Sequence, residues 1–228
     1  MPSARESRAA LELVTTEAVS DGQEFLQRLN GTPEAQRLAL LDSIPGLIGY
    51  YADGSAALAA DFYDESRALA GVKVPYTSEL VIADRVVKIR RAIAWSAEPL
   101  FTGDGDPAGR LAEVIQLETA RPYRDTIVGN RRKDPASVGW KRIANPGACR
   151  FCRFLAARGA IYKQDTATFA SHPHCFCSAA PVFEGGEPGP EATAEQYIAS
   201  RRKRTAKQQD AMRNWLDYFD ETGKTSLT

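Results

Sequence analysis

The residues of this chain that could bind a soft metal ion are gathered in one short segment. All 4 cysteines and both histidines lie in it, arranged as a Cys-x-x-Cys pair followed by a His-Pro-His-Cys-Phe-Cys run. Thiol and imidazole side chains in two such elbows are typical of a tetrahedral structural zinc site. The six candidate ligands are Cys149, Cys152, His172, His174, Cys175 and Cys177.

The first elbow, Cys149-x-x-Cys152, has the form of a zinc knuckle, in which a tight turn aims two thiolates at one point. The second elbow must supply two more ligands. A turn at Pro173 would bring His172 toward Cys175, and this pair is favoured. In an extended backbone, residues two apart share a face, so His174 and Cys177 come next.

Other chemistries fit the segment less well. Disulfides are disfavoured in an intracellular chain and leave both histidines unexplained, and unmetallated thiols are the remaining alternative. The His-x-Glu of zinc deaminases and the His-Glu-x-x-His of metalloproteases are absent, as are the nucleophile elbow, the P-loop and the dinucleotide fingerprint. We therefore expect no enzymatic activity and no small-molecule substrate.

Composition indicates an ordinary globular protein. The chain has 228 residues, with 29 Lys+Arg against 29 Asp+Glu, so no overall field draws it to nucleic acid or to an anionic membrane. The N-terminus lacks the apolar run of a signal peptide, and no stretch is long and apolar enough for a membrane span. We expect a protein made in the cytoplasm, without membrane contact.

The first part of the chain has helical periodicity. Apolar residues at spacings of three and four predict a helix ending near Asn30, and Thr32-Pro33 opens a second helix that Pro45-Gly46 should break. Further helices are expected over 47–69, 80–95 and 107–129, with a loop at 102–106. Pro122 should kink or split the last of these helices.

The pattern changes after residue 134. Residues 138–143 alternate like a strand, 176–183 resemble a closing strand, and 185–190 form a flexible linker before one or two helices over 191–221. The expected fold is α+β, with a helical domain (1–134), a small zinc-knuckle β-hairpin domain (135–184) and a linker with C-terminal helices (185–228). Metal loss should unfold the middle domain selectively, because it is too small to be held by packing alone.

A basic run, Arg201 to Arg204, followed by Lys207 supports an alternative hypothesis. A zinc-ribbon protein could bind nucleic acid through this run together with other basic residues near the motif, and such binding would weaken steeply with salt. The zero net charge counts against it. The additional candidates are Lys141, Arg142, Arg150 and Arg153.

The order of the motif residues resembles the Mu-F-like minor head proteins of tailed bacteriophages, with actinobacteriophage proteins the most similar in character. The likeness covers about 139–183 and fits the preceding helices more loosely. It is carried by Gly139-Trp140-x-Arg142, Cys149-x-x-Cys152-x-x-Leu155, Gly159-x-x-Tyr162, Phe169, His172-Pro-His174-Cys175-x-Cys177 and Pro181-x-Phe183.

The resemblance implies a minor capsid component, in the interior of the virion head near the portal. It implies the phage portal protein as partner, with capsid, scaffold and packaged DNA as further candidates, and it implies no catalysis. His174 stands at a position that varies in the family, and many members lack the first cysteine pair. Metal binding therefore has to be argued from this chain's own residues.

Overall fold

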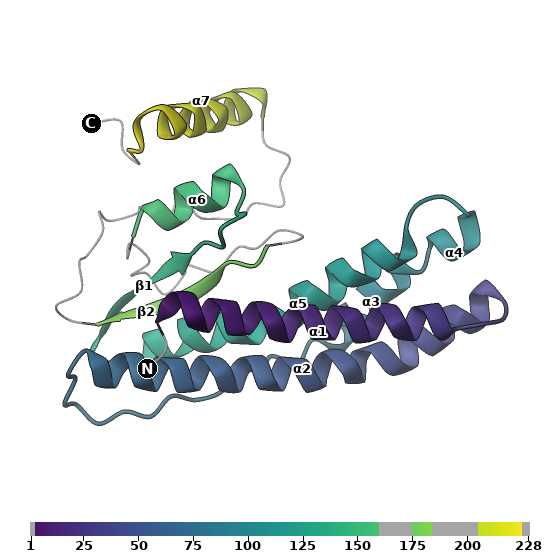
Figure 1. Ribbon diagram of the computed structural model, residues 1–228, viewed down its shortest axis with the longest axis horizontal. Coiled ribbons are helices and arrows are strands. Elements are labelled where there is room, and N and C mark those ends of the chain that lie inside the picture. The colour runs from purple at the N-terminus through teal and green to yellow at the C-terminus, as the bar shows by residue number, and fades with distance from the viewer. Residues whose placement is uncertain (1–2, 160–174, 184–204, 225–228) are drawn as a thin grey trace.

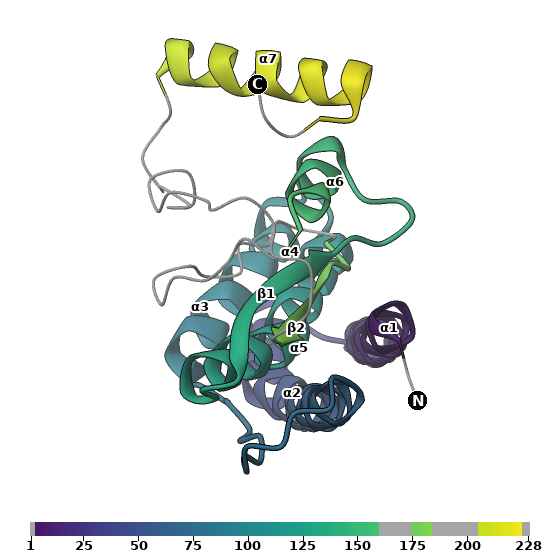
Figure 2. The same cartoon turned by 90° about the vertical axis from the view of Figure 1, so that its left-hand side faces the viewer.

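Three long helices form the body of the protein, and a two-stranded sheet covers one end of it (Figures 1 and 2). The computed structural model describes residues 3–159, 175–183 and 205–224. The long helices are α1 (Ala4–Arg28), α2 (Pro33–Leu69) and α5 (Pro107–Lys133), which lie side by side in both views. The predicted α+β class is confirmed. The remaining elements are α3 (Val86–Ser96), α4 (Pro99–Thr102), β1 (Ser137–Ile143), α6 (Arg150–Ala157), β2 (Ser178–Phe183) and α7 (Ala206–Thr222).

Side-chain caps set the starts of the long helices. Ser3 and Glu6 form a capping box at the start of α1. Thr32 caps α2 and Asp106 caps α5, each followed by proline at the first helical position. These starts follow from local sequence, and the predicted start of the second helix at Thr32-Pro33 is confirmed.

The predicted break at Pro45-Gly46 is wrong, because α2 continues through Pro45 to Leu69 as one helix. Proline removes one helical donor and leaves a carbonyl four residues earlier without its partner. That carbonyl, of Leu41, accepts a hydrogen bond from α3 instead. Likewise Pro122 lies buried within α5 and does not divide it into two helices.

The helix predicted over 80–95 begins only at Val86, and the residues before it, from 80 to 85, form neither helix nor strand. Asn130 on α5 accepts from the Glu79 main-chain N–H and donates to the Glu79 carbonyl, both at 2.8 Å. Thr126 accepts from the Val81 N–H at 3.0 Å. Of these main-chain groups, the Glu79 carbonyl is the one that would accept the first hydrogen bond of a helix over 80–95, and Asn130 occupies it instead. Local periodicity could not indicate this partner on α5.

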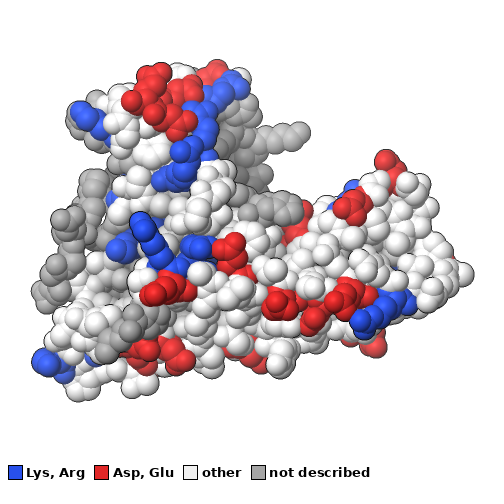
Figure 3. Space-filling view, in the orientation of Figure 1, with Lys and Arg blue, Asp and Glu red and all other residues white. Residues whose placement is uncertain are grey.

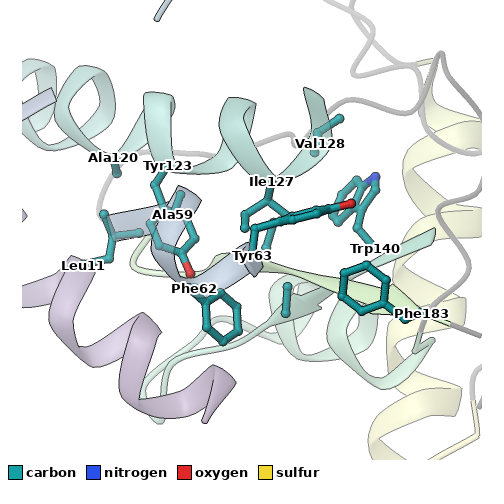
Figure 4. Packing of buried hydrophobic residues seen from close by; sticks show 12 residues of the cluster. Leu11, Ala59, Phe62, Tyr63, Ala120, Tyr123, Ile127, Val128, Trp140 and Phe183 are labelled. Carbon is teal, nitrogen blue, oxygen red and sulfur yellow. The ribbon is translucent and has the colours of Figure 1, made fainter. Parts of the chain in front are cut away.

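β1 and β2 pair in antiparallel fashion, with Trp140 opposite Pro181 and Ile143 opposite Ser178. This confirms the strand that alternation predicted over 138–143 and the closing strand that was predicted over 176–183. The sheet packs into the same hydrophobic cluster as α1, α2 and α5 (Figure 4). Within that cluster the rings of Tyr63 and Phe183 meet edge to face, with centroids 5.5 Å apart.

The two-stranded sheet and the helices therefore share a core. The strands do not form the predicted hairpin, because α6 lies between them in the chain. The boundary at residue 134 stays a prediction, but Asp134 at that point is buried and bound by Arg67 at 2.8 Å. A second apolar cluster fills the other end of the helical body, around Ile44, Ile93 and Ile115. None of the helices in the described parts of the chain has the length and apolar character needed to span a membrane.

Candidate metal centre

Three buried cysteines converge on one point beside the sheet. The sulfur atoms of Cys152, Cys175 and Cys177 all lie within 4.8 Å of one another, and those of Cys152 and Cys175 are 3.8 Å apart. The three side chains are at most 3% exposed. The two elbows predicted from sequence are therefore adjacent, although 23 residues separate Cys152 from Cys175.

Cys149 stands beside this group without being part of it. It is the N-cap residue of α6, it is exposed, and its sulfur accepts a hydrogen bond from the Cys152 main-chain N–H at 3.5 Å. The sequence did not predict this helix. All four cysteines lie in the described residues and form no disulfide there. His172 and His174 lie outside the described residues.

Arg124 joins the second elbow to the helical body. Its side chain, on α5, is 2% exposed. Nε and Nη2 donate to the Cys177 carbonyl at 3.0 and 2.9 Å, and Nη2 also donates to the Cys175 carbonyl at 2.8 Å. The planar guanidinium group thus holds two carbonyls that are two residues apart.

Two polar side chains, on β1 and just after it, contact the sulfur atoms. Arg142 on β1, also 2% exposed, lies with Nη1 3.9 Å from the Cys152 sulfur. The Asn145 side-chain oxygen lies 3.7 Å from the Cys177 sulfur. Contacts of this kind orient ligands and adjust their charge in thiolate metal sites.

The pKa values of the Cys152 and Cys175 thiols are shifted in opposite directions. The hydrogen bond with Cys152, then that with Cys177, and then the charge of Arg124 lower the pKa of Cys175. The hydrogen bond with Cys175 raises the pKa of Cys152. Burial lowers the pKa of Arg124 to about 10. The arrangement favours a first thiolate at Cys175, and thiolate is the form that binds metal.

Three converging thiols fit a metal ion that prefers soft ligands and four-coordinate geometry. The cysteine geometry would leave one coordination position for Cys149, His172 or His174. An 8-residue helix would supply one ligand and the segment directly before β2 would supply two, so the ion would connect elements that are far apart along the chain.

Two of the basic residues proposed to bind nucleic acid are buried or paired with acidic side chains. Arg142 is buried, and Arg150 pairs with Asp217 and Asp220 on α7, each at 2.6 Å. Oppositely charged side chains lie next to one another over α6 and α7, at the upper left of Figure 3. Arg201 to Arg204 lie outside the described residues. No contact in the described residues favours nucleic-acid binding.

Arg124 is not among the site residues that the sequence motif predicts. A usable signal existed, because Arg124 stands four residues after buried Ala120 and three before buried Ile127, on the apolar face of its helix. An arginine at such a position needs a buried partner. Helical periodicity could have indicated its burial, whereas its partners on Cys175 and Cys177 required the fold.

The structure defines a helical protein whose core includes a two-stranded antiparallel sheet, with a buried thiol cluster beside that sheet. A family model described as VG15 protein matches residues 2–200, and the chain therefore belongs to the VG15 protein family. α7 lies beyond the matched residues.

The Gene 15 protein of Mycobacterium phage L5 is 31% identical to this chain over 175 residues. That match covers 69% of this chain and 56% of the phage L5 protein, so the chain spans little more than half of that relative. No solved structure matches the chain. Together the two matches support a phage origin.

Proposed function

We propose that this protein is a non-enzymatic minor component of a phage head, of the Mu-F-like kind, and that one structural zinc ion stabilises α6 and the Cys175–Cys177 segment beside the sheet. The observation that carries the proposal is the convergence of Cys152, Cys175 and Cys177 within 4.8 Å of one another. The same motif residues supply the resemblance to minor head proteins. Membership of the VG15 protein family and, separately, the likeness to the Gene 15 protein of Mycobacterium phage L5 support the phage assignment.

Zinc fits the donor set better than harder ions. Three buried thiols are soft ligands, and Mg²⁺ or Ca²⁺ would require oxygen ligands in their place. Cys152, Cys175 and Cys177 would supply three thiolates, and Cys149, His172 or His174 would supply the fourth ligand. With four protein ligands the site has no open position for a reacting water, which is the arrangement of a structural site.

The role of the ion would be to hold α6 and the Cys175–Cys177 segment against the sheet. β1 and β2 have apolar packing of their own against α5, and so they need the ion less. Metal removal is therefore expected to loosen α6 and the Cys175–Cys177 segment first. A domain that depended on zinc alone would lose both strands as well.

Elemental analysis of the purified full-length chain tests the metal. We expect about one zinc per chain in the wild type and a clear loss in Cys152→Ser and in Cys175→Ser. Asp53→Asn, a surface variant far from the thiols in sequence, is the control and should retain its zinc. A wild-type protein purified without chelators that contains no bound metal would refute the zinc half of the proposal.

The head assignment is tested in particles of the encoding phage. We propose the portal protein as principal partner, inside the head at the portal vertex, with capsid, scaffold and packaged DNA as further contacts. Mass spectrometry of purified heads should detect the chain at low copy number, and it should co-purify with portal rings. A chain abundant in infected cells but absent from heads would contradict the assignment.

A further inference from the structure

Two buried guanidinium groups, from two different secondary-structure elements, lie beside the thiol cluster. Arg124 comes from α5 and Arg142 from β1, and each residue is 2% exposed. Both contact the cysteine segments directly, through the Cys175 and Cys177 carbonyls and the Cys152 sulfur. Two cations thus lie at the one place in the described chain where three thiols gather.

Burying a guanidinium group costs several kcal/mol unless an anion or a full set of hydrogen bonds compensates it. A divalent ion with three thiolates carries one excess negative charge, and a fourth thiolate would add another. Such a centre is an anion in a low-dielectric environment, and it needs nearby cations for the same reason. The two arginines and a thiolate metal centre therefore satisfy one another's charge.

Arg124 also positions the Cys175–Cys177 segment. In an extended backbone, alternate carbonyls point the same way, and alternate side chains share a face. By binding the Cys175 and Cys177 carbonyls together, at 2.8 and 3.0 Å, Arg124 holds this segment in the register that puts both sulfur atoms on one side. Arg142 acts on the opposite elbow, with Nη1 3.9 Å from the Cys152 sulfur.

We propose that Arg124 and Arg142 are the built-in counter-charges of the metal centre, and that Arg124 in addition positions two of its ligands. The inference rests on the proposed zinc site and names what makes that site selective for an anionic, thiolate-bound ion. Both residues are positioning residues, because neither would bind the ion itself.

Zinc competition against a chromogenic chelator tests this on the full-length chain. Arg124→Gln and Arg142→Gln should each weaken zinc binding by about 10- to 100-fold, the usual effect of losing a residue that supports metal ligands. Arg142→Lys keeps the charge and should recover most of the affinity. Arg124→Lys should recover less, because an ammonium group cannot bind two carbonyls in the same planar geometry.

The matched control is Arg121→Gln, on the same helix three residues earlier, where Arg121 lies 3.5 Å from Glu118. Its zinc affinity should equal that of the wild type. If Arg124→Gln and Arg142→Gln bind zinc within about threefold of that control, the counter-charge role is wrong while the zinc site stands. A wild-type chain without zinc would instead remove the site and this inference together.

Thermal unfolding with and without zinc distinguishes a counter-charge role of Arg124 and Arg142 from a contribution to packing alone. We expect the glutamine variants to lower the Tm of the zinc-loaded protein by more than the Tm of the metal-free protein, because only the zinc-loaded form presents an anionic centre to the two arginines. Equal losses of Tm in both forms, with zinc affinity unchanged, would make the two arginines structural only and would overturn the proposal.

Discussion

The Arg90 side chain donates a hydrogen bond from Nη1 to the main-chain carbonyl oxygen of Leu41, at 2.7 Å. Leu41 precedes Pro45 by four residues, so its carbonyl is the one that the proline leaves without a helical donor. α3 therefore repairs the defect in α2 from outside, and α2 remains one helix. Local sequence rules place a break there because they take no account of an arginine 49 residues away.

Arg90→Ala should lower the free energy of unfolding by about 0.5–1.5 kcal/mol, the usual net value of one hydrogen bond. Urea unfolding followed by circular dichroism measures it. Arg91→Ala is the neighbouring control and should have a smaller effect.

The mechanism can be isolated by adding Pro45→Ala. Alanine restores a main-chain donor to the Leu41 carbonyl, so Arg90→Ala should cost less in the Pro45→Ala background than in the wild type. An identical cost in both backgrounds would mean that Arg90 contributes through something other than this carbonyl.

The ion pair between Arg85 and Glu118 should make the free energy of unfolding depend on pH in the acidic range. Two hydrogen bonds of 2.7 and 2.8 Å join the side chains. Burial would raise the pKa of Glu118, but Arg85 and then Arg121 outweigh it and bring the pKa below its ordinary value of 4.5. A carboxylate with a lowered folded-state pKa stabilises the fold above its unfolded pKa, and this contribution is lost as pH falls through the folded value.

Glu118→Gln should therefore cost about 1.5–3 kcal/mol at neutral pH. The difference between wild type and variant should shrink as the pH falls below about 4.5. Urea unfolding at a series of pH values gives this difference, in which the opposite contribution of Asp125, whose pKa burial raises, largely cancels. A difference that stays constant down to pH 3 would exclude the linkage.

Cys149 is expected to supply the fourth metal ligand. It caps the helix that carries Cys152, and a helix N-terminus favours a thiolate. In the cobalt-substituted protein, Cys149→Ser should reduce the sulfur-to-cobalt charge-transfer absorption by about a quarter, as expected when one of four thiolates is lost. His172→Ala and His174→Ala should leave that band and the metal content unchanged. Loss of cobalt binding in either histidine variant, with Cys149→Ser unaffected, would assign the position to histidine.

α7 should be held to α6 chiefly by an aromatic contact. The rings of Phe154 and Phe219 meet edge to face at 5.5 Å, whereas the Arg150 pairs with Asp217 and Asp220 are exposed and should contribute little. Phe219→Ala removes an aromatic pair worth about 0.5–1.5 kcal/mol beyond its buried area. Hydrogen exchange of α7 should rise more in Phe219→Ala than in Asp217→Asn, and the reverse order would contradict this.

Sequence alone determined the features that depend on near neighbours. Helix starts at Thr32 and Asp106 follow from side chains that cap the adjacent turn, and the strand over 137–143 follows from alternation. The grouping of Cys149, Cys152, Cys175 and Cys177 was likewise visible, because composition and spacing are local properties.

Tertiary structure decided what depends on distant partners. Arg90 keeps α2 intact across Pro45, and Asn130 binds the main chain at Glu79 so that α3 begins only at Val86. The fold also selected Cys175 with Cys177 to join Cys152, and it placed Arg124 on their carbonyls. Hydrogen-bond donors, acceptors and charges are satisfied by whichever groups the fold brings near, and spacing along the chain does not carry that information.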